Sequence, residues 1–407
     1  MALKRTIGKI VVVSQHYAPD QSATANIITA VATHLAKSME VLVLSGSSNL
    51  LPAKLQNADE PIVIGIKNSL PDKTALSKRA LSELVFSVRT FIALLAKLRS
   101  GDVVLTVTAP FMLPYAVTAA ARLRGGRTIL ILHDLYPDVL VMAGLLSPKS
   151  IVTKAIHTAN ALMFRALDIV VIIGRDMEHL LIRYKGMTRE KMTFIPNWAT
   201  LTPGVRPLVP DNIYRSRCTA PFVVGLSGNL GFTHDPNVVF DAAALLQTNP
   251  NVQFLLSGWG MGFERLKARQ AETPLANINL IERVPDENLE EFLSAADVWI
   301  IPYRKNVAGV SVPSRFYNLL AMGRPVLIIS EPDAEAALTV SQNDLGWVVP
   351  PGDPSILAKT ICAASSDKDI EIKRAKAAAI AVQYSQPAAL KSYERLSSAL
   401  LKKLMLG

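Results

Sequence analysis

The stretch from Ser311 to Gly323 contains the side chains best suited to bind an anionic group. Pro313 suits the first turn of a helix, because its missing N–H would have no partner there. The hydroxyls of Ser311 and Ser314 could accept from the free N–H groups of that turn, and Gly323 could end the helix in a left-handed conformation. A helix N-terminus beside Arg315 is a suitable site for a phosphate group. An ordinary helix–strand unit of an α/β protein would show the same spacing.

The dipeptide His133–Asp134 could transfer a proton or orient a hydroxyl group. It follows the apolar run 129–132, which predicts a strand. Ligands of doubly wound sheets lie beyond the carboxyl ends of the strands, so both side chains are expected at a cleft. A His–Asp pair is more often a structural hydrogen-bonded pair, and the dipeptide alone does not identify an enzyme.

Two glycine-containing turns follow apolar runs in the second half of the chain. The run 222–226 leads into Ser-Gly-Asn-Leu-Gly at 227–231, and the run 252–256 leads into Ser-Gly-Trp-Gly at 257–260. Glycine lets a backbone approach a pyrophosphate closely, although a tight turn would also explain each pattern.

The sequence predicts that two α/β domains position these candidate binding and catalytic groups. A chain of 407 residues exceeds one ordinary core, and its 50% hydrophobic content suits large buried sheets. The apolar runs 10–13 and 41–44 flank a helical pattern, which is typical of the opening of a doubly wound domain. Prolines at 203, 207 and 210 indicate an interdomain linker.

The positive charge of the chain lies entirely in its first half. Residues 1–200 contain 23 Lys and Arg against 13 Asp and Glu, whereas the remainder carries 20 of each. A basic half of this kind can bind anionic lipid, nucleic acid or phosphorylated ligands. We expect no nucleic acid, because aromatic residues are scarce and no binding motif is present. The two cysteines, Cys218 and Cys362, indicate a reducing compartment, and the run 10–13 is too short for a signal-peptide core.

Residues 73–99 predict a long amphipathic helix. One face is expected to pack on the core: Leu81, Leu84, Val85, Val88, Ile92 and Leu95. The other face is basic and also holds Phe86: Lys78, Arg79, Arg89 and Lys97. That face is either simply solvated or directed at an anionic membrane. The uncharged run 103–121 is long enough to span a bilayer, but Pro110 and Pro114 favour a strand, a loop and a helix instead.

Several motifs together resemble the retaining glycosyltransferases of the GT-B fold, family 4. The segment 312–326, Val-Pro-Ser-Arg-Phe-Tyr-Asn-Leu-Leu-Ala-Met-Gly-Arg-Pro-Val, resembles the donor-binding signature of the colanic-acid, exopolysaccharide and O-antigen branch. His-Asp-Leu-Tyr-Pro-Asp at 133–138, Ile-Pro-Asn-Trp at 195–198 and the turn 227–231 match further segments of that family in the same order.

This resemblance implies two Rossmann-like domains that face each other across a cleft. It places the first, acceptor and membrane-side domain at 1–203 and the nucleotide-sugar domain at 204–385, with residues 386–407 crossing back to the first. It also implies transfer of a sugar from a nucleotide-activated donor with retention, with no cofactor and no essential metal. A UDP-sugar is favoured over a GDP-sugar. The acceptor is expected to be a lipid-linked or oligosaccharide glycan, at the cytoplasmic face of the cell membrane.

The resemblance assigns three sets of residues. The catalytic set comprises His133, Asp134 and Arg315. The donor-binding set comprises Gly228, Asn229, Gly231, Arg283, Val284, Val310, Ser311, Val312, Pro313, Ser314 and Asn318. The acceptor-side set comprises Tyr17, Asp20, Ser22 and Thr24.

The chain departs from the family pattern at a pair of glutamates that many relatives carry. Val310 and Asn318 occupy the matching positions. Asn318 could still bond a ribose hydroxyl, as a weaker acceptor than a carboxylate, whereas Val310 offers only its backbone. Two alternatives therefore stand beside the transferase. One is a catalytically silent GT-B protein that assists another transferase, and the other is a sugar-nucleotide epimerase on the same fold.

Overall fold

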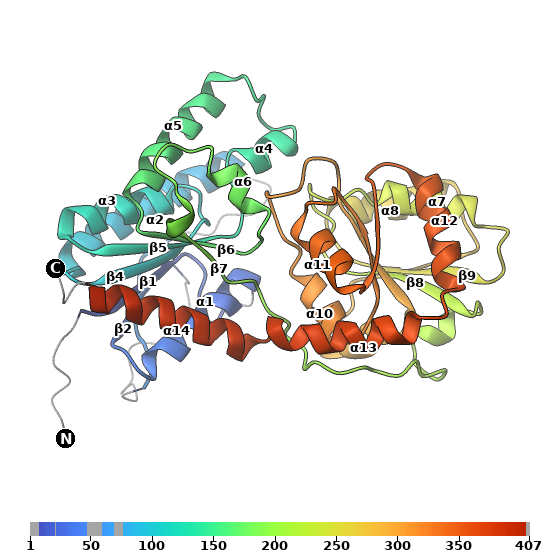
Figure 1. Ribbon diagram of the computed structural model, residues 1–407. Helices are drawn as coiled ribbons and strands as arrows, with labels where there is room; N and C mark the ends of the chain where they lie inside the picture. The colour runs from blue at the N-terminus through green and yellow to red at the C-terminus, as the bar shows by residue number, and fades with distance from the viewer. Residues whose placement is uncertain (1–7, 21, 47–58, 69–75, 404–407) are drawn as a thin grey trace.

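The computed structural model describes residues 8–20, 22–46, 59–68 and 76–403. It contains two α/β domains side by side, each built on a twisted parallel sheet with helices on both faces (Figure 1). The expected fold class is confirmed. Each domain buries its strands on both sides, as an all-parallel sheet requires.

The first domain contains a seven-stranded sheet in the order β3-β2-β1-β4-β5-β6-β7. Its strands are β1 Ile10–Ser14, β2 Val41–Ser45, β3 Ile62–Gly65, β4 Val103–Val107, β5 Arg127–Leu132, β6 Ile169–Ile172 and β7 Met192–Phe194. Its helices are α1 Ala23–Ala36, α2 Leu76–Lys97, α3 Leu113–Arg124, α4 Asp138–Met142, α5 Ile151–Ala166 and α6 Met177–Leu181. The sequence order changes between β1 and β4, and the crevice at the carboxyl ends of these strands faces the second domain.

The second domain contains a six-stranded sheet in the order β10-β9-β8-β11-β12-β13. Its strands are β8 Phe222–Leu226, β9 Val252–Ser257, β10 Ile278–Ile281, β11 Val298–Pro302, β12 Val326–Ile329 and β13 Gly346–Val349. Its helices are α7 Asn237–Leu245, α8 Met261–Glu272, α9 Leu289–Leu293, α10 Arg315–Ala321, α11 Glu335–Asn343, α12 Pro354–Ser365 and α13 Ile370–Ala381. Short 3-10 turns occur at Arg189–Lys191, Arg215–Arg217, Asp286–Asn288 and Val382–Tyr384.

The last helix, α14 (Gln386–Lys403), returns to the first domain and packs along α1. Figure 1 shows α13 and α14 running in succession along one edge of the molecule, past both domains. Glu394 of α14 accepts from His34 of α1 at 3.1 Å and from Ser38 at 2.9 Å. The chain therefore crosses between the domains twice, and the two crossings meet where the Ala199 N–H donates to Tyr384 O at 3.1 Å.

The face of helix α2 that packs on the core is not the face that the sequence predicted. Phe86, Leu94 and Leu98 are fully buried against α3 and the sheet. The stripe predicted to be buried is mostly exposed, and we call it the α2 apolar stripe: Leu81, Leu84, Val85, Val88 and Ile92. The helix has apolar residues on two faces, so periodicity alone could not decide which face is inside. The side chains of Lys78 and Arg79 lie outside the described residues, while Arg89 and Lys97 are exposed.

The uncharged run 103–121 forms β4, a loop and most of α3, as the two prolines indicate. In the part of the chain that the structure describes, none of the helices combines the length and apolarity needed to cross a membrane.

The two domains are joined by a reciprocal contact between the starts of α6 and α11, which we call the interdomain clasp (Arg175, Asp176, Gly309 and Glu335). The Asp176 carboxylate of the first domain accepts from the Glu335 N–H at 3.0 Å and from the Gly309 N–H at 2.8 Å. In return, the Glu335 carboxylate accepts from the Arg175 N–H at 2.7 Å. Each domain thus supplies a carboxylate to backbone N–H groups of the other, and one of these, the Glu335 N–H, is a group that the first turn of α11 leaves without an intrahelical partner.

Arg175 reinforces the clasp by donating Nε and Nη2 to the Glu335 carboxylate at 2.9 Å each. The Glu335 side chain is only 2% exposed, while that of Arg175 is 40% exposed. Burial, together with the nearby Glu335 charge, raises the pKa of the Asp176 carboxyl group. The ion pair with Arg175 offsets part of the cost of burying the Glu335 carboxylate.

We predict that Glu335→Gln weakens the contact between the domains. The substitution keeps the shape but removes the buried charge that Arg175 pairs with, at a cost of about 1–3 kcal/mol because Arg175 is partly exposed. X-ray scattering in solution should show a larger radius of gyration, and thermal unfolding should begin at a lower temperature. The matched control is Glu290→Gln, which removes the half-exposed partner of Arg206 and should change neither. Equal behaviour of both variants would contradict a clasp.

Candidate functional site

A cleft of about 560 Å³ lies between the domains, and we call it the Arg315 cleft. The second domain contributes the turn at Gly228 and the start of α10, and the first contributes the start of α1 and the linker after β7. The lining residues from the first domain and linker include Ala23, Asn26, Ile27, Asn197, Trp198 and Thr200. It is the crevice that the carboxyl ends of both sheets predict.

Arg315 holds the glycine turn that forms one wall of this cleft. Its Nη1 donates to Ser227 O and its Nη2 donates to Asn229 O. Gly228 has φ +101°, and a Cβ there would lie 3.1 Å from Arg315 Cζ, so the turn requires glycine. Burial lowers the pKa of Arg315 to about 10, which leaves the guanidinium charged at neutral pH. The structure therefore brings Arg315, Gly228 and Asn229 together, as expected, and leaves their contact with a ligand a prediction.

Trp259 forms an aromatic platform directly beside the glycine turn, since its backbone N–H donates to Gly228 O at 3.4 Å and its carbonyl accepts from the Leu230 N–H at 2.8 Å. It is 41% exposed, and the Arg283 guanidinium stacks on its ring at 4.6 Å from the centroid. Val284 also lines the cleft and is nearly buried. Trp259 was not among the predicted site residues. An aromatic residue within the turn 257–260 was the available signal, since an exposed ring beside a cleft suits a planar base.

The loop from Val310 to Ser314 crosses from the clasp to the cleft. Val310 O accepts from the Leu135 N–H of the first domain at 3.4 Å. Val312 is buried against Gly174 of the first domain, and Pro313 is also buried. These contacts fix the loop between the two domains and leave Ser314 at the cleft.

The predicted capping of α10 is wrong. The helix begins at Arg315, with Pro313 outside it and Ser314 as its N-cap, and the Ser314 side chain makes no capping hydrogen bond. Ser314 has helical φ and ψ, whereas a capping serine normally adopts an extended conformation that directs its oxygen at the helix. The Ser311 side chain instead hydrogen-bonds Asp134 across the domain boundary. Gly323, with φ +63°, follows the helix in the left-handed conformation, as expected.

His133 and Asp134 follow β5 and face the loop of the second domain. Thr108 at the end of β4 fixes both, because its Oγ1 accepts from the His133 N–H at 3.2 Å and from the Asp134 N–H at 3.3 Å. Burial lowers the pKa of His133 to about 4. Burial also raises the pKa of Asp134 to about 6, against the hydrogen bond from Ser311. His133 Nε2 is buried without a hydrogen-bond partner among the described residues. Neither His133 nor Asp134 is among the residues that line the Arg315 cleft, so their contact with a ligand there stays a prediction.

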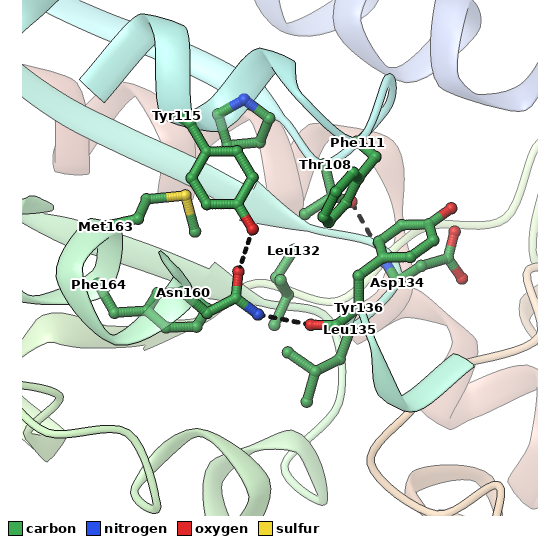
Figure 2. A pocket seen from close by; sticks show the side chains of 11 residues that line it. Thr108, Phe111, Tyr115, Leu132, Asp134, Leu135, Tyr136, Asn160, Met163 and Phe164 are labelled. Atoms are coloured by element: carbon green, nitrogen blue, oxygen red, sulfur yellow. Dashed lines mark hydrogen bonds between the residues drawn. The ribbon is translucent and has the colours of Figure 1, made fainter. Parts of the chain in front are cut away.

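The segment after Asp134 rests on a small, closely packed pocket (Figure 2). Asn160 of α5 donates to Tyr136 O at 2.6 Å and accepts from the Tyr115 hydroxyl at 2.5 Å. The Phe111 ring packs on that of Tyr136, with 5.2 Å between the centroids. Figure 2 shows these side chains filling the pocket, with the Asp134 carboxylate directed away from it. This pocket is a support for the 133–138 segment.

Asn318 lines the Arg315 cleft, but its side chain is engaged by the linker. Its Oδ1 accepts from the Thr200 N–H at 2.7 Å and from the Leu201 N–H at 3.3 Å. Its Nδ2 donates to Thr200 Oγ1 at 3.0 Å. These bonds give Asn318 a structural role at the crossing between domains, and its contact with a ribose stays a prediction.

The predicted acceptor-side residues divide between core and loop. Tyr17 is 5% exposed and packs in the first domain's core, which is a correction to its predicted place at the cleft. Asp20 bonds His16 Nδ1 at 2.5 Å and accepts from the Ser22 N–H at 2.8 Å. Ser22 caps α1 by accepting from the Ala25 N–H, and Thr24 is half-buried. Among the predicted cleft residues Gly231 is half-buried next to the Gly228 turn.

Comparison with known families and proteins finds two domain matches. Residues 217–382 match "Glycosyl transferases group 1", and residues 24–198 match "Glycosyl transferase 4-like domain". The chain is 28% identical over 300 residues to the probable glycosyltransferase WbjE of Pseudomonas aeruginosa, which covers 71% of this chain and 72% of that protein.

The chain is also 27% identical over 270 residues to the putative colanic acid biosynthesis glycosyl transferase WcaI of Escherichia coli (strain K12). That match covers 64% of this chain and 66% of WcaI, just under two thirds of its length. Among solved structures, Anabaena HepE in complex with UDP has a TM-score of 0.67 at 15% identity, covering 96% of this chain and 100% of HepE. At that identity the likeness shows the fold.

We predict that His133→Gln changes how stability depends on pH. The pKa of His133 is about 4 in the folded chain and about 6.5 when unfolded, so this residue makes the folded state gain stability as pH rises from about 4 to about 6.5. The variant loses that gain, so its free energy of unfolding should fall relative to the wild type by about 3 kcal/mol across this window. Denaturation at a series of pH values measures the difference.

Asp134 opposes His133 in the wild type. Its raised pKa makes stability fall as pH rises from its unfolded value to about 6, so the two slopes partly cancel. A His133 signal that titrates near 6.5 in NMR would contradict the buried, neutral imidazole.

Proposed function

Because the two glycosyl transferase domains span residues 24–198 and 217–382, the chain belongs to the GT-B glycosyltransferases of family 4, and we propose that it transfers a sugar from a nucleotide-sugar donor to a lipid-linked glycan with retention of configuration. The observation that carries the proposal is the Arg315 cleft, in which a charged arginine and a glycine turn lie beside an exposed tryptophan.

Two parts of this cleft match two parts of a nucleotide-sugar. The exposed face of Trp259 and the edge at Val284 suit the base. Arg315 and the backbone around Gly228 suit the diphosphate, because a guanidinium binds phosphate oxygens in a fixed geometry. His133 and Asp134 do not line this cleft but adjoin its loop through Ser311, and we propose that they contact the sugar.

A UDP-sugar is the proposed donor. The related fold of HepE has been solved with UDP and with UDP-glucose. The alternative donor is a GDP-sugar, and the calorimetric experiment below distinguishes the two nucleotides.

The proposed chemistry places few demands on side chains. Departure of the diphosphate needs stabilisation of the charge that develops on it, which Arg315 and the N–H groups of the glycine turn supply without a metal. The Asp134 carboxylate, mostly ionised at neutral pH, and the neutral His133 imidazole orient the sugar and the incoming hydroxyl. Transfer should therefore continue in the presence of a chelator.

We further propose a role in surface polysaccharide assembly at the inner face of the cell membrane. The names of WbjE and WcaI support this class of product, since WcaI is described as a colanic acid biosynthesis enzyme. The α2 apolar stripe and the excess of basic residues in the first half support attachment to an anionic bilayer.

We predict that UDP binds this protein and that Arg315→Ala weakens the binding about tenfold, equivalent to about 1.4 kcal/mol. The loss follows from removing a charge that faces the diphosphate and anchors the turn at Gly228. Isothermal titration calorimetry with UDP and GDP measures it and identifies the base. Arg217→Ala, at an exposed arginine outside the cleft, is the matched control and should bind like the wild type. If neither nucleotide binds below the millimolar range, the donor site is refuted and a catalytically silent protein becomes the better account.

We predict that Leu84→Glu and Val88→Glu together reduce binding to vesicles with anionic phosphatidylglycerol at least tenfold. Each side chain would otherwise contribute up to about 1.5 kcal/mol on entering the bilayer surface. Cosedimentation with vesicles measures the bound fraction. Ile372→Glu, at an exposed position on α13, should leave it unchanged. Equal loss in all variants, or none in either, would exclude α2 as the attachment surface.

A further inference from the structure

The linker between the domains forms part of the Arg315 cleft and is held at both ends. At its start, the Ile195 N–H donates to a carbonyl of β6 at 3.0 Å. At its end, the Thr200 N–H donates to Asn318 Oδ1 of α10 at 2.7 Å. The side chains of Asn197 and Trp198, between these two points, both line the cleft. Their position is therefore fixed before any ligand arrives.

Asn197 and Trp198 are buried residues whose polar atoms remain open. The two residues are 7% and 8% exposed. Neither the Asn197 amide nor the Trp198 indole N–H has a hydrogen-bond partner among the described residues, and solvent still reaches both groups. Because these residues line the cleft and are otherwise enclosed, their open polar atoms face it. Polar groups of buried side chains are nearly always paired, so a ligand is expected to supply the partners.

Asn318, the residue at which the sequence predicted a ribose contact, is occupied by the linker instead. Its Oδ1 accepts from the Thr200 and Leu201 N–H groups, and its Nδ2 donates to Thr200 Oγ1. A ribose could bond this amide only by displacing the linker. The Asn197 amide needs no such displacement.

The two open side chains lie on the wall that a ribose would face. Ribose joins the base to the diphosphate, which we place at Trp259 and Arg315 of the second domain. Asn318 follows Arg315 by three residues, about 4.5 Å along α10, and holds the linker. The linker therefore approaches the diphosphate position within about one helical turn, and it forms the side of the cleft opposite the second domain.

The chemistry of the open groups matches two adjacent hydroxyl groups. A primary amide donates through its nitrogen and accepts through its oxygen, and each hydroxyl can do both. Asn197 can therefore accept from one ribose hydroxyl while it donates to the next. The Trp198 indole N–H only donates, which suits a hydroxyl oxygen that has given its own proton to the amide.

We propose that Asn197 and Trp198 bind the ribose hydroxyl groups of the donor nucleotide, and that Asn318 is a positioning residue that holds the linker for them. This inference rests on the proposed transferase function. It moves ribose recognition from α10 to the linker between the domains. Because UDP and GDP contain the same ribose, it does not depend on which base the cleft selects.

The test compares two nucleotides that differ only in the ribose hydroxyl groups, UDP and 2′,3′-dideoxyuridine 5′-diphosphate, by isothermal titration calorimetry. If GDP is the nucleotide that binds, GDP and its dideoxy analogue replace them. Asn197→Leu and Trp198→Phe remove the open polar atoms and keep an apolar side chain of similar shape. We expect each to weaken UDP about tenfold and to leave the dideoxy nucleotide unchanged, since the lost atoms have nothing to bind in that ligand.

Thermal unfolding separates a binding role from a structural one. The Asn197 amide has no partner among the described residues, so Asn197→Leu should not lower the unfolding temperature. Asn318→Leu removes the bonds to the linker, so it should lower the unfolding temperature and weaken both nucleotides alike.

Asn251→Leu, at an exposed asparagine outside the cleft, is the matched control and should bind both nucleotides like the wild type. Unchanged UDP affinity in Asn197→Leu and Trp198→Phe, or an equal loss for both nucleotides, would overturn this inference alone. If the wild type binds neither UDP nor GDP, the donor site is refuted and the inference falls with it. The two failures are therefore distinguishable.

Discussion

The exchange of carboxylates between the starts of α6 and α11 fixes the relative position of the two domains. The Asp176 carboxylate accepts hydrogen bonds from two N–H groups of the second domain. The Glu335 carboxylate accepts from the backbone N–H and the guanidinium of Arg175 in the first domain. Both carboxylates are buried, and each would be left without its partners if the domains separated. The Arg315 cleft exists only as a space between surfaces that this contact holds at a set distance.

The clasp also determines the shape of the loop that enters the Arg315 cleft. Gly309 has φ +76°, and a Cβ at that position would lie 2.6 Å from Asp176 O, so the first domain packs directly on the loop backbone. The next three residues, Val310, Ser311 and Val312, then contact Leu135, Asp134 and Gly174 of the first domain, respectively. Arg315 lies two residues after Pro313 and donates a hydrogen bond to Ser227 O of the glycine turn. The glycine turn is therefore connected through one short stretch of backbone to the contact between the domains.

Much of this architecture could be predicted from the sequence, and the failures have physical causes. Strands such as Val103–Val107 are continuous apolar runs, which local pattern detects well. The face of α2 could not be predicted, because both of its faces carry apolar residues and only the packing on α3 decides between them. The engagement of Asn318 by Thr200 and the clasp itself join residues more than a hundred positions apart. Such pairs leave no local spacing to detect.

The return of α14 to the first domain has a consequence for how the chain is made. The surface of α1 that His34 and Ser38 share with Glu394 is covered by a helix that lies beyond the whole second domain in sequence. During synthesis the first domain emerges with its sheet complete but with this surface bare, and it stays so until residues 386–403 have left the ribosome. Folding of the first domain is therefore finished last, although its strands are made first.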